Sequence, residues 1–391
     1  MNIALIGNGF TGATLPLVNH LHKLGQKVDC YYIVKRGVSS IESLDFGDKI
    51  SYIAGSVCDL SKSNQLYQYL SEEIDVELVP VFNRKIRLER LGVGKVFPFL
   101  NRKIIQKFCH FLFQKKYDLV NLIVHNPLEL QIATFLKENG IKFCVTFHEV
   151  LNNLIDAQDL KPQVKMVLKY DVPIVVHSQK TKDDLIRLSV NNSLDKRIHL
   201  IHFGPFESYK QYGEGNTPVH LNDYLLFLGR ITHYKGLKYL YEAVNMLDDI
   251  PNIKVVVAGS GNDEVLRQMK IDERFVVLNR FIGNNELVGL IRGSRAVICP
   301  YIAASQSGLV QTTMPFGKPI IATKVGAFTE IIKDGENGYL AEPADSLSLA
   351  NAVRKLYNGK EAGNEARIPE CYNWNHIATE YIQLFEQYSR I

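Results

Sequence analysis

Short apolar runs alternate with amphipathic stretches along most of the chain, and this alternation constrains the fold more than any other feature. The apolar runs of the first half are IALIG (3–7), VDCYYIV (28–34), LVNLIVH (119–125), FCVTFH (143–148) and VPIVVHS (172–178), and those of the second half lie at 224–230, 253–261, 275–279, 296–301 and 319–323. Continuous apolar runs are typical of strands buried on both faces, and the amphipathic stretches between them of covering helices. We therefore predict an α/β fold of two Rossmann-like doubly wound domains that face each other across a cleft.

The length agrees with two domains, because 391 residues exceed the roughly 100–200 of a single one. The stretch 207–220 is polar and rich in turn-forming residues, so it is the predicted linker. We place an N-terminal domain at 1–206 and a C-terminal domain at 221–372. The amphipathic segment 373–391 is expected to form a helix that packs back on the N-terminal domain.

The composition indicates a cytoplasmic globular protein. No apolar run approaches the ~20 residues that a membrane span needs, and the first residues are typical of a strand rather than a signal peptide. The six cysteines have no CxxC spacing, which favours reduced thiols over disulfides or a zinc site.

A glycine-rich loop follows the first predicted strand. Gly7 to Gly12 match the GxGxxG pattern between a strand and a helix, which is typical of dinucleotide binding. The second strand ends at Lys35 and Arg36 instead of an acidic residue, and these cations suit the 2′-phosphate of NADP. An NADP-dependent oxidoreductase is therefore one hypothesis. The same loop would also suit another anion at a helix N-terminus, or close packing with no ligand.

A pair of cations follows the first strand of the second half. Arg230 and Lys235 lie beside Gly229 and Gly236, at the carboxyl end of the run 224–230. A guanidinium and an ammonium there can neutralise a diphosphate leaving group, and the alternative is two solvated surface cations.

The order of motifs in the second half resembles the nucleotide-sugar domain of family 4 glycosyltransferases, which have the two-Rossmann GT-B fold. These motifs are GR…KG (229–236), VVVAGSG (255–261), PY…SGL (300–309), FGKPIIAT (316–323), VGAFTEII (325–332) and DGENGYLAEP (334–343). The resemblance is strong over 224–345. It is weak in the first half, where it rests on Gly7–Gly12, TFHE (146–149), VVHS (175–178) and LIHFG (200–204).

The resemblance implies roles for individual residues. Arg230 and Lys235 match the pair that grips the donor diphosphate, and His148 matches a histidine near the transferred sugar. The remaining positions match donor-binding positions: Gly9, Gly229, Phe281, Ile282, Ser307, Gly308, Leu309, Thr312 and Glu330. The family usually carries two glutamates here, the second on the donor ribose. This chain has Ala304 and Thr312, or Ser305 and Thr313, in their place, as in a QSG-motif subset of the family. A threonine hydroxyl would bind the ribose more weakly than a carboxylate.

The function expected from the resemblance is a retaining, hexosyltransferase-type glycosyltransferase. It would move a sugar from a nucleotide-diphosphate sugar to a saccharide or lipid-linked acceptor, in surface polysaccharide or glycan biosynthesis. No cofactor or metal is expected, because cations and backbone amides replace the metal and no HxH or HExxH pattern accompanies the eleven histidines. The alternatives are the oxidoreductase and a catalytically inactive nucleotide-sugar-binding homologue.

A basic segment interrupts the first half. Residues 84–116 contain ten basic residues and one acidic residue, whereas the whole chain carries only +4. The segment also contains Phe97, Phe99, Phe108, Phe111 and Phe113. It is either a helix with a solvated basic face or a helix that docks on an anionic membrane at the inner face of the cell membrane. Nucleic acid is not an expected partner, because no nucleic-acid-binding module is present.

Overall fold

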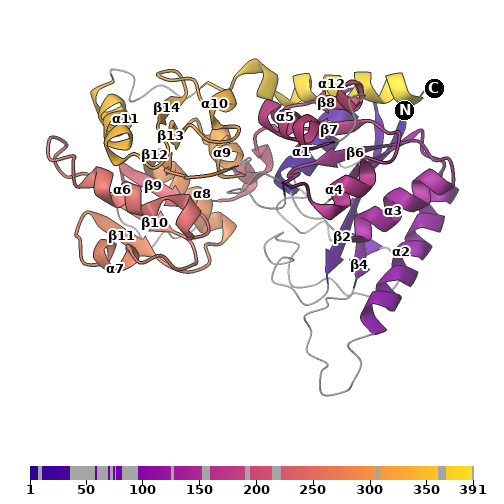
Figure 1. Ribbon diagram of the computed structural model, residues 1–391, viewed down its shortest axis with the longest axis horizontal. Coiled ribbons are helices and arrows are strands. Elements are labelled where there is room, and N and C mark those ends of the chain that lie inside the picture. The colour runs from indigo at the N-terminus through magenta and orange to yellow at the C-terminus, as the bar shows by residue number, and fades with distance from the viewer. Residues whose placement is uncertain are drawn as a thin grey trace. The chain divides into compact units, whose positions relative to one another are not determined.

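The computed structural model describes two compact units, one formed by Met1–Phe203 with Trp374–Ile391 and the other by Gly204–Asn373 (Figure 1). The described residues are 1–7, 11–35, 58–59, 69–70, 74, 76–81, 96–124, 127–151, 159–189, 194–213, 222–304, 308–359 and 367–389. Gly9, Ser307 and His125 lie outside them, as do 84–95 of the basic segment.

The first unit is built on an eight-stranded sheet of order β3-β4-β2-β1-β5-β6-β7-β8. Its strands are β1 (Asn2–Gly7), β2 (Lys27–Lys35), β3 (Cys58–Asp59), β4 (Val76–Val81), β5 (Leu119–Ile123), β6 (Phe143–Phe147), β7 (Ile174–Val176) and β8 (Ile198–Leu200). All neighbours pair in parallel except β3 with β4. The order reverses direction at β1, the strand that leads into the predicted glycine loop.

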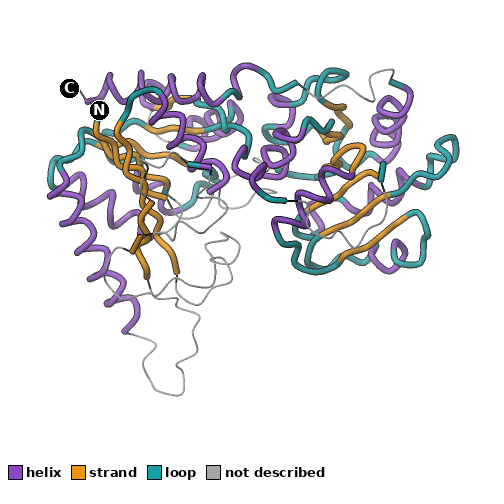
Figure 2. The backbone as a smooth tube through the Cα atoms, turned by 180° about the vertical axis from the view of Figure 1, so that it is seen from behind, coloured by secondary structure: helices purple, strands orange, loops and turns teal. Residues whose placement is uncertain are grey.

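Helices cover both faces of this sheet (Figures 1 and 2). The helices are α1 (Thr11–Lys23), α2 (Val96–Lys115), α3 (Pro127–Glu138), α4 (Pro162–Val167), α5 (Gln179–Leu188), the 3-10 turn η4 (Leu194–Arg197) and α12 (Trp374–Ser389). Alternate residues of a strand point to opposite faces, so Val120 and Leu122 of β5 pack into the core under α2 and α3. Asn121 faces the other way and shares a hollow with residues of α1 and α12. The final helix therefore completes the first unit.

The second unit is built on a six-stranded parallel sheet of order β11-β10-β9-β12-β13-β14. Its strands are β9 (Tyr224–Leu228), β10 (Val255–Ala258), β11 (Phe275–Leu278), β12 (Ser294–Cys299), β13 (Ile320–Thr323) and β14 (Gly338–Ala341). The helices are α6 (Leu237–Val244), α7 (Leu266–Met269), α8 (Asn284–Gly293), α9 (Gly308–Thr313), α10 (Phe328–Ile331) and α11 (Ser346–Asn358), with 3-10 turns η5 (Glu207–Gln211), η6 (His233–Lys235), η7 (Met314–Phe316) and η8 (Glu370–Tyr372). The order reverses between β9 and β12, which is where ligands of open parallel sheets bind. The predicted fold class of two Rossmann-like sheets is confirmed.

The predicted linker differs from the structure at its beginning. Residues Glu207–Gln211 form η5 within the second unit, and the backbone N–H of Phe206 donates to the carbonyl of Gln311 at 2.9 Å. The rings of Phe206, Tyr209 and Tyr212 pack in succession, with centroids 6.0 and 5.5 Å apart. Aromatic packing therefore makes this polar-looking stretch part of a folded unit, while 214–220 lie outside the described residues.

Candidate functional site

The loop after β9 is fixed by close backbone packing. Gly236 has φ +71°, and a Cβ there would lie 1.8 Å from the carbonyl oxygen of Pro300. The backbone N–H of Ile302 donates to the carbonyl of Tyr234 at 2.8 Å. Only glycine fits this contact without displacing backbone, so the loop that carries Arg230 and Lys235 is held against the segment that follows β12.

The loop after β10 packs just as closely on the loop after β9. A Cβ on Gly259 would lie 1.8 Å from the carbonyl oxygen of Gly229, and one on Gly261 would lie 2.0 Å from that of Ile231. The side chain of Asn279 accepts from the N–H of Gly261 and donates to its carbonyl, at 3.2 and 3.1 Å. The glycines after β9 and β10 therefore let these two loops pack closely, and a Cβ on Gly229 would meet nothing within 4 Å, which leaves its backbone open to a ligand.

The two cations of the β9 loop differ in environment. Arg230 is exposed, whereas Lys235 is half-buried and its Nζ lies 3.5 Å from the ring centroid of Tyr301. Burial lowers the pKa of Lys235 to about 8, and the nearby charge of Arg230 acts in the same direction. Two like charges that act on each other in this way favour binding of an anion near both of them.

The helix after β12 begins at Gly308, with Leu309 half-buried. The hydroxyl of Thr312 donates to the carbonyl of Gly308 at 2.7 Å, and that of Thr313 to Leu309 at 2.8 Å. Both threonines are buried. Their hydroxyl protons are thus used inside the helix, and their oxygens can still accept a hydrogen bond from a ligand. Ala304 is half-buried and packs on the core.

The other predicted donor residues lie on separate loops of the same unit. Phe281 is 66% exposed and Ile282 is buried. Arg280 pairs with Glu286 at 2.6 and 2.7 Å and also donates to the carbonyl of Phe281, which fixes this turn. Glu330 lies half-buried on α10. The pKa of Tyr372 is raised first by burial of Tyr372 itself and then by the nearby charge of Glu330.

In the first unit, His148 follows β6 and is only 6% exposed. Its ring centroid lies 4.8 Å from those of both His177 and Phe203. Burial lowers the pKa of His177 to about 4, so its imidazole is neutral near pH 7. Its Nδ1 atom lies 2.8 Å from the carbonyl oxygen of Ile201, which can only accept a hydrogen bond, so the single ring proton is on Nδ1. His177 and Phe203 are absent from the predicted site, although His177 was recognisable as a histidine at a strand end.

The residue after His148, Glu149, forms an ion pair with Lys161. In the described part of the chain, no three His, Cys, Asp or Glu side chains come together as metal ligands.

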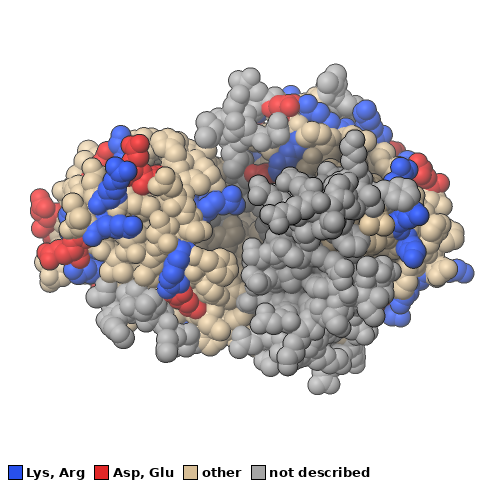
Figure 3. All heavy atoms as spheres, turned by 90° about the horizontal axis from the view of Figure 1, so that it is seen from below, with Lys and Arg blue, Asp and Glu red and all other residues tan. Residues whose placement is uncertain are grey.

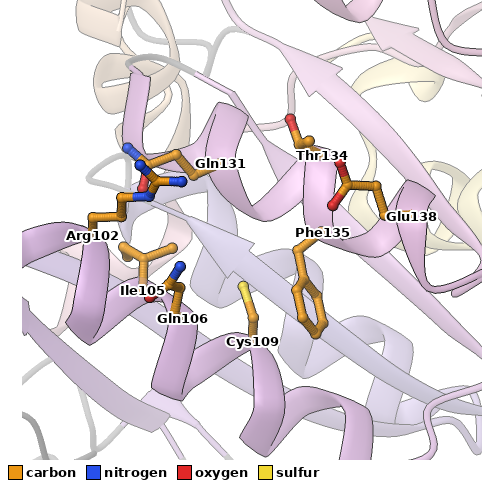
Figure 4. A pocket seen from close by; sticks show the side chains of 8 residues that line it. All are labelled: Arg102, Ile105, Gln106, Cys109, Gln131, Thr134, Phe135 and Glu138. Atoms are coloured by element: carbon orange, nitrogen blue, oxygen red, sulfur yellow. The ribbon is translucent and has the colours of Figure 1, made fainter.

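A second hollow, of about 420 Å³, lies between α2 and α3. Figure 4 shows Arg102 beside Gln131 at one end and Glu138 at the other, over Ile105, Cys109 and Phe135. The outer face of α2 is basic, with Arg102, Lys103, Lys107, His110 and Lys115 exposed. Figure 3 shows Lys and Arg side chains on the side of this unit where Figure 1 has α2 and α3.

The phenylalanines of α2 do not all lie at the surface, where a membrane could contact them. Phe108 is 3% exposed and Phe111 is half-buried, because the helical period turns them toward the sheet. Phe113 is 53% exposed, and the side chains of Phe97 and Phe99 lie outside the described set. No helix among the described residues is long and apolar enough to cross a membrane.

Part of the chain is similar in sequence to known glycosyltransferases. Residues 222–359 match the protein-family model described as "Glycosyl transferases group 1". An uncharacterized glycosyltransferase of Methanocaldococcus jannaschii is 25% identical over 54% of this chain and 59% of its own length. A phosphatidyl-myo-inositol mannosyltransferase of Mycobacterium leprae is 29% identical over 41% of this chain and 46% of its own length. The chain thus spans about half the length of these two curated relatives.

A solved structure shares the whole fold. HepE of Anabaena, in complex with UDP and glucose, superposes with a TM-score of 0.60 at 15% identity, over 100% of this chain and 99% of its own. Residues 222–359 are therefore similar to the group 1 glycosyltransferase domain, and the two units have the fold of GT-B glycosyltransferases.

Proposed function

We propose that this protein is a retaining glycosyltransferase that transfers a hexose from a nucleotide-diphosphate sugar to a saccharide or lipid-linked acceptor. The group 1 domain and its relatives support a transferase that uses nucleotide sugars. HepE has been solved with UDP-glucose, which supports the same class of donor here.

The observation that carries the proposal is the pair Arg230 and Lys235 on a loop held by glycine contacts. Departure of a nucleoside diphosphate leaves negative charge on its phosphate oxygens, and fixed cations stabilise that charge. The cations take the part that a metal ion plays in other transferases, so we propose that the reaction needs no metal and no cofactor.

The remaining predicted donor residues have supporting roles in this proposal. The turn at Phe281 and Ile282, held by Arg280, offers backbone groups to the base, and Gly229 admits the phosphates. Ser307, Gly308 and Leu309 contribute amides, and Glu330 contacts the sugar. Thr312 contributes its hydroxyl oxygen, which donates to Gly308 within the helix and can still accept a hydrogen bond from the ribose.

The first unit supplies the acceptor side, with Gly9 and His148 near the transferred sugar. The ring of His148 packs against the ring of His177, which is neutral, so His148 has an uncharged neighbour on that side. The exposed cations of α2 support docking on an anionic membrane surface, where a lipid-linked acceptor and a role in surface polysaccharide synthesis would fit.

A thermal-shift panel of UDP, GDP, ADP and NADP(H) tests the class of ligand. We expect one nucleoside diphosphate to stabilise the protein, and Arg230→Ala to abolish this shift while Arg267→Ala, on the exposed face of α7, retains it. Stabilisation by NADP(H) alone would instead indicate the oxidoreductase. The nucleotide sugar of the stabilising nucleotide is then assayed for transfer, with the anomer of the product read by NMR. Binding without turnover would indicate an inactive homologue, and an inverted anomer would contradict retention.

A further inference from the structure

The ammonium of Lys235 rests on an aromatic ring that is itself immobilised. Its Nζ lies 3.5 Å from the ring centroid of Tyr301, a residue only 1% exposed. The Tyr301 ring packs against fully buried Phe328 with centroids 5.4 Å apart. The hydroxyl of Thr323 donates to the Tyr301 carbonyl at 2.6 Å. The ring is therefore a rigid platform.

The surroundings of Lys235 are poor in negative charge. The groups that act on it are the Arg230 guanidinium, the Cys299 thiol and the rings of Tyr234 and Tyr301. Burial raises the pKa of Cys299 to about 12, so this thiol is neutral near pH 8. Within the described part of the chain, no carboxylate forms an ion pair with Lys235. The face of the Tyr301 ring is then the main group that favours the ammonium over the neutral amine.

We propose that Tyr301 is a positioning residue that holds Lys235 beside Arg230, and that binding of a diphosphate at this pair is coupled to uptake of one proton by the Lys235 amine. The inference rests on the proposed donor site. The proton comes from solvent and ends on Nζ, and no covalent bond to the ligand forms.

The coupling follows from what the site contains. Without a ligand, burial and Arg230 disfavour the charged lysine, and its pKa of about 8 leaves part of the population neutral above that pH. A bound diphosphate supplies the missing negative charge and raises this pKa again. Affinity should therefore fall as the pH rises above about 8, by up to roughly tenfold per pH unit.

Isothermal titration of the full chain with the nucleoside diphosphate that stabilises it tests the coupling. Titrations at pH 7.5–9.5 avoid ionisation of the terminal phosphate, whose second pKa is about 6. Buffers of different ionisation enthalpy report the number of protons taken up. We expect uptake that approaches one proton above pH 8, and none for Lys235→Arg, whose charge is permanent. Binding with no proton uptake in the wild type would overturn the coupling while leaving the donor site intact, whereas no binding by any nucleotide would remove both.

Two variants isolate the role of Tyr301. Tyr301→Phe keeps the ring and should retain the pH profile. Tyr301→Met keeps an apolar side chain without a π face, so the midpoint of the profile should move to lower pH and affinity at pH 8 should fall about tenfold. An unchanged midpoint in a folded Tyr301→Met protein would show that the ring only fills space. Should Tyr301→Met not fold, a changed midpoint in Tyr301→Phe would contradict the ring's role, because only the hydroxyl is removed.

Discussion

The ring of His177 lies 4.8 Å from the ring of His148, and its Nδ1–H is held by the backbone carbonyl of Ile201. The neutral imidazole of His177 thus packs against His148, the histidine that we propose lies near the transferred sugar.

The buried His177 should make the protein less stable as the pH falls. Its folded-state pKa of about 4 lies below the ordinary 6.5, so the unfolded chain binds more protons between these values. Stability therefore decreases as the pH is lowered through the window from 6.5 to 4, by about 3 kcal/mol in total. His177→Asn, whose amide can still donate to Ile201, should flatten the dependence of Tm on pH. The exposed His376→Asn serves as the control, and equal slopes in both variants would contradict the assignment.

Removal of Arg230 should impair transfer far more than it impairs folding. The guanidinium is exposed, so Arg230→Ala should change the free energy of unfolding by less than about 0.5 kcal/mol. Loss of a group that stabilises the leaving diphosphate should lower kcat/KM by about 100- to 1,000-fold. The measurement is steady-state transfer beside Arg267→Ala, which should match the wild type. Near-normal turnover of Arg230→Ala would exclude this residue from the reaction.

Substitution at Gly236 should destabilise the second unit. A Cβ there meets the Pro300 carbonyl at 1.8 Å and forces a side chain into the left-handed region at φ +71°. Gly335 has a similar φ of +82° with nothing within 4 Å of a Cβ, so Gly335→Ala isolates the cost of backbone strain, about 1–2 kcal/mol. Urea unfolding should show a loss of at least about 2 kcal/mol more for Gly236→Ala than for Gly335→Ala. Equal losses would mean that the contact with Pro300 relaxes freely.

Binding to membranes should depend on the charges of α2. Lys103 and Lys107 are exposed on this helix, and each basic residue near an anionic surface contributes about 1 kcal/mol. The double variant Lys103→Glu/Lys107→Glu should bind phosphatidylserine liposomes at least tenfold more weakly in a flotation assay. Lys270→Glu, on the second unit, should retain binding. Salt should weaken the wild-type interaction steeply, and equal binding to neutral liposomes would exclude an electrostatic origin.

Much of the fold could be predicted from the sequence because buried parallel strands appear as apolar runs. The run 172–178 contains β7, and the run 224–230 contains β9. Strand β4 is harder to recognise, because Glu77 and Pro80 interrupt its apolar pattern. Such a strand is defined by its partner β2, and pairing partners are not visible in local sequence.

The candidate site could be predicted only in part. Arg230 and Lys235 are visible because cations beside glycines at a strand end form a local pattern. The contact between Lys235 and the ring of Tyr301 is not visible in the sequence, because the two residues are 66 positions apart and only the fold brings them together. The bond from Thr312 to Gly308 was equally hidden, since a threonine pattern does not say where its hydroxyl points.

The packing of α12 on α1 has a consequence for synthesis of the chain. Trp374 and Ile377 of this helix are buried in the first unit, although the whole second unit precedes them in sequence. Residues 204–373 therefore separate the strands of the N-terminal sheet from the last helix that covers it. The half that begins first is thus finished last, and a variant truncated after residue 373 would keep the second unit whole but leave the first unit with an open apolar face.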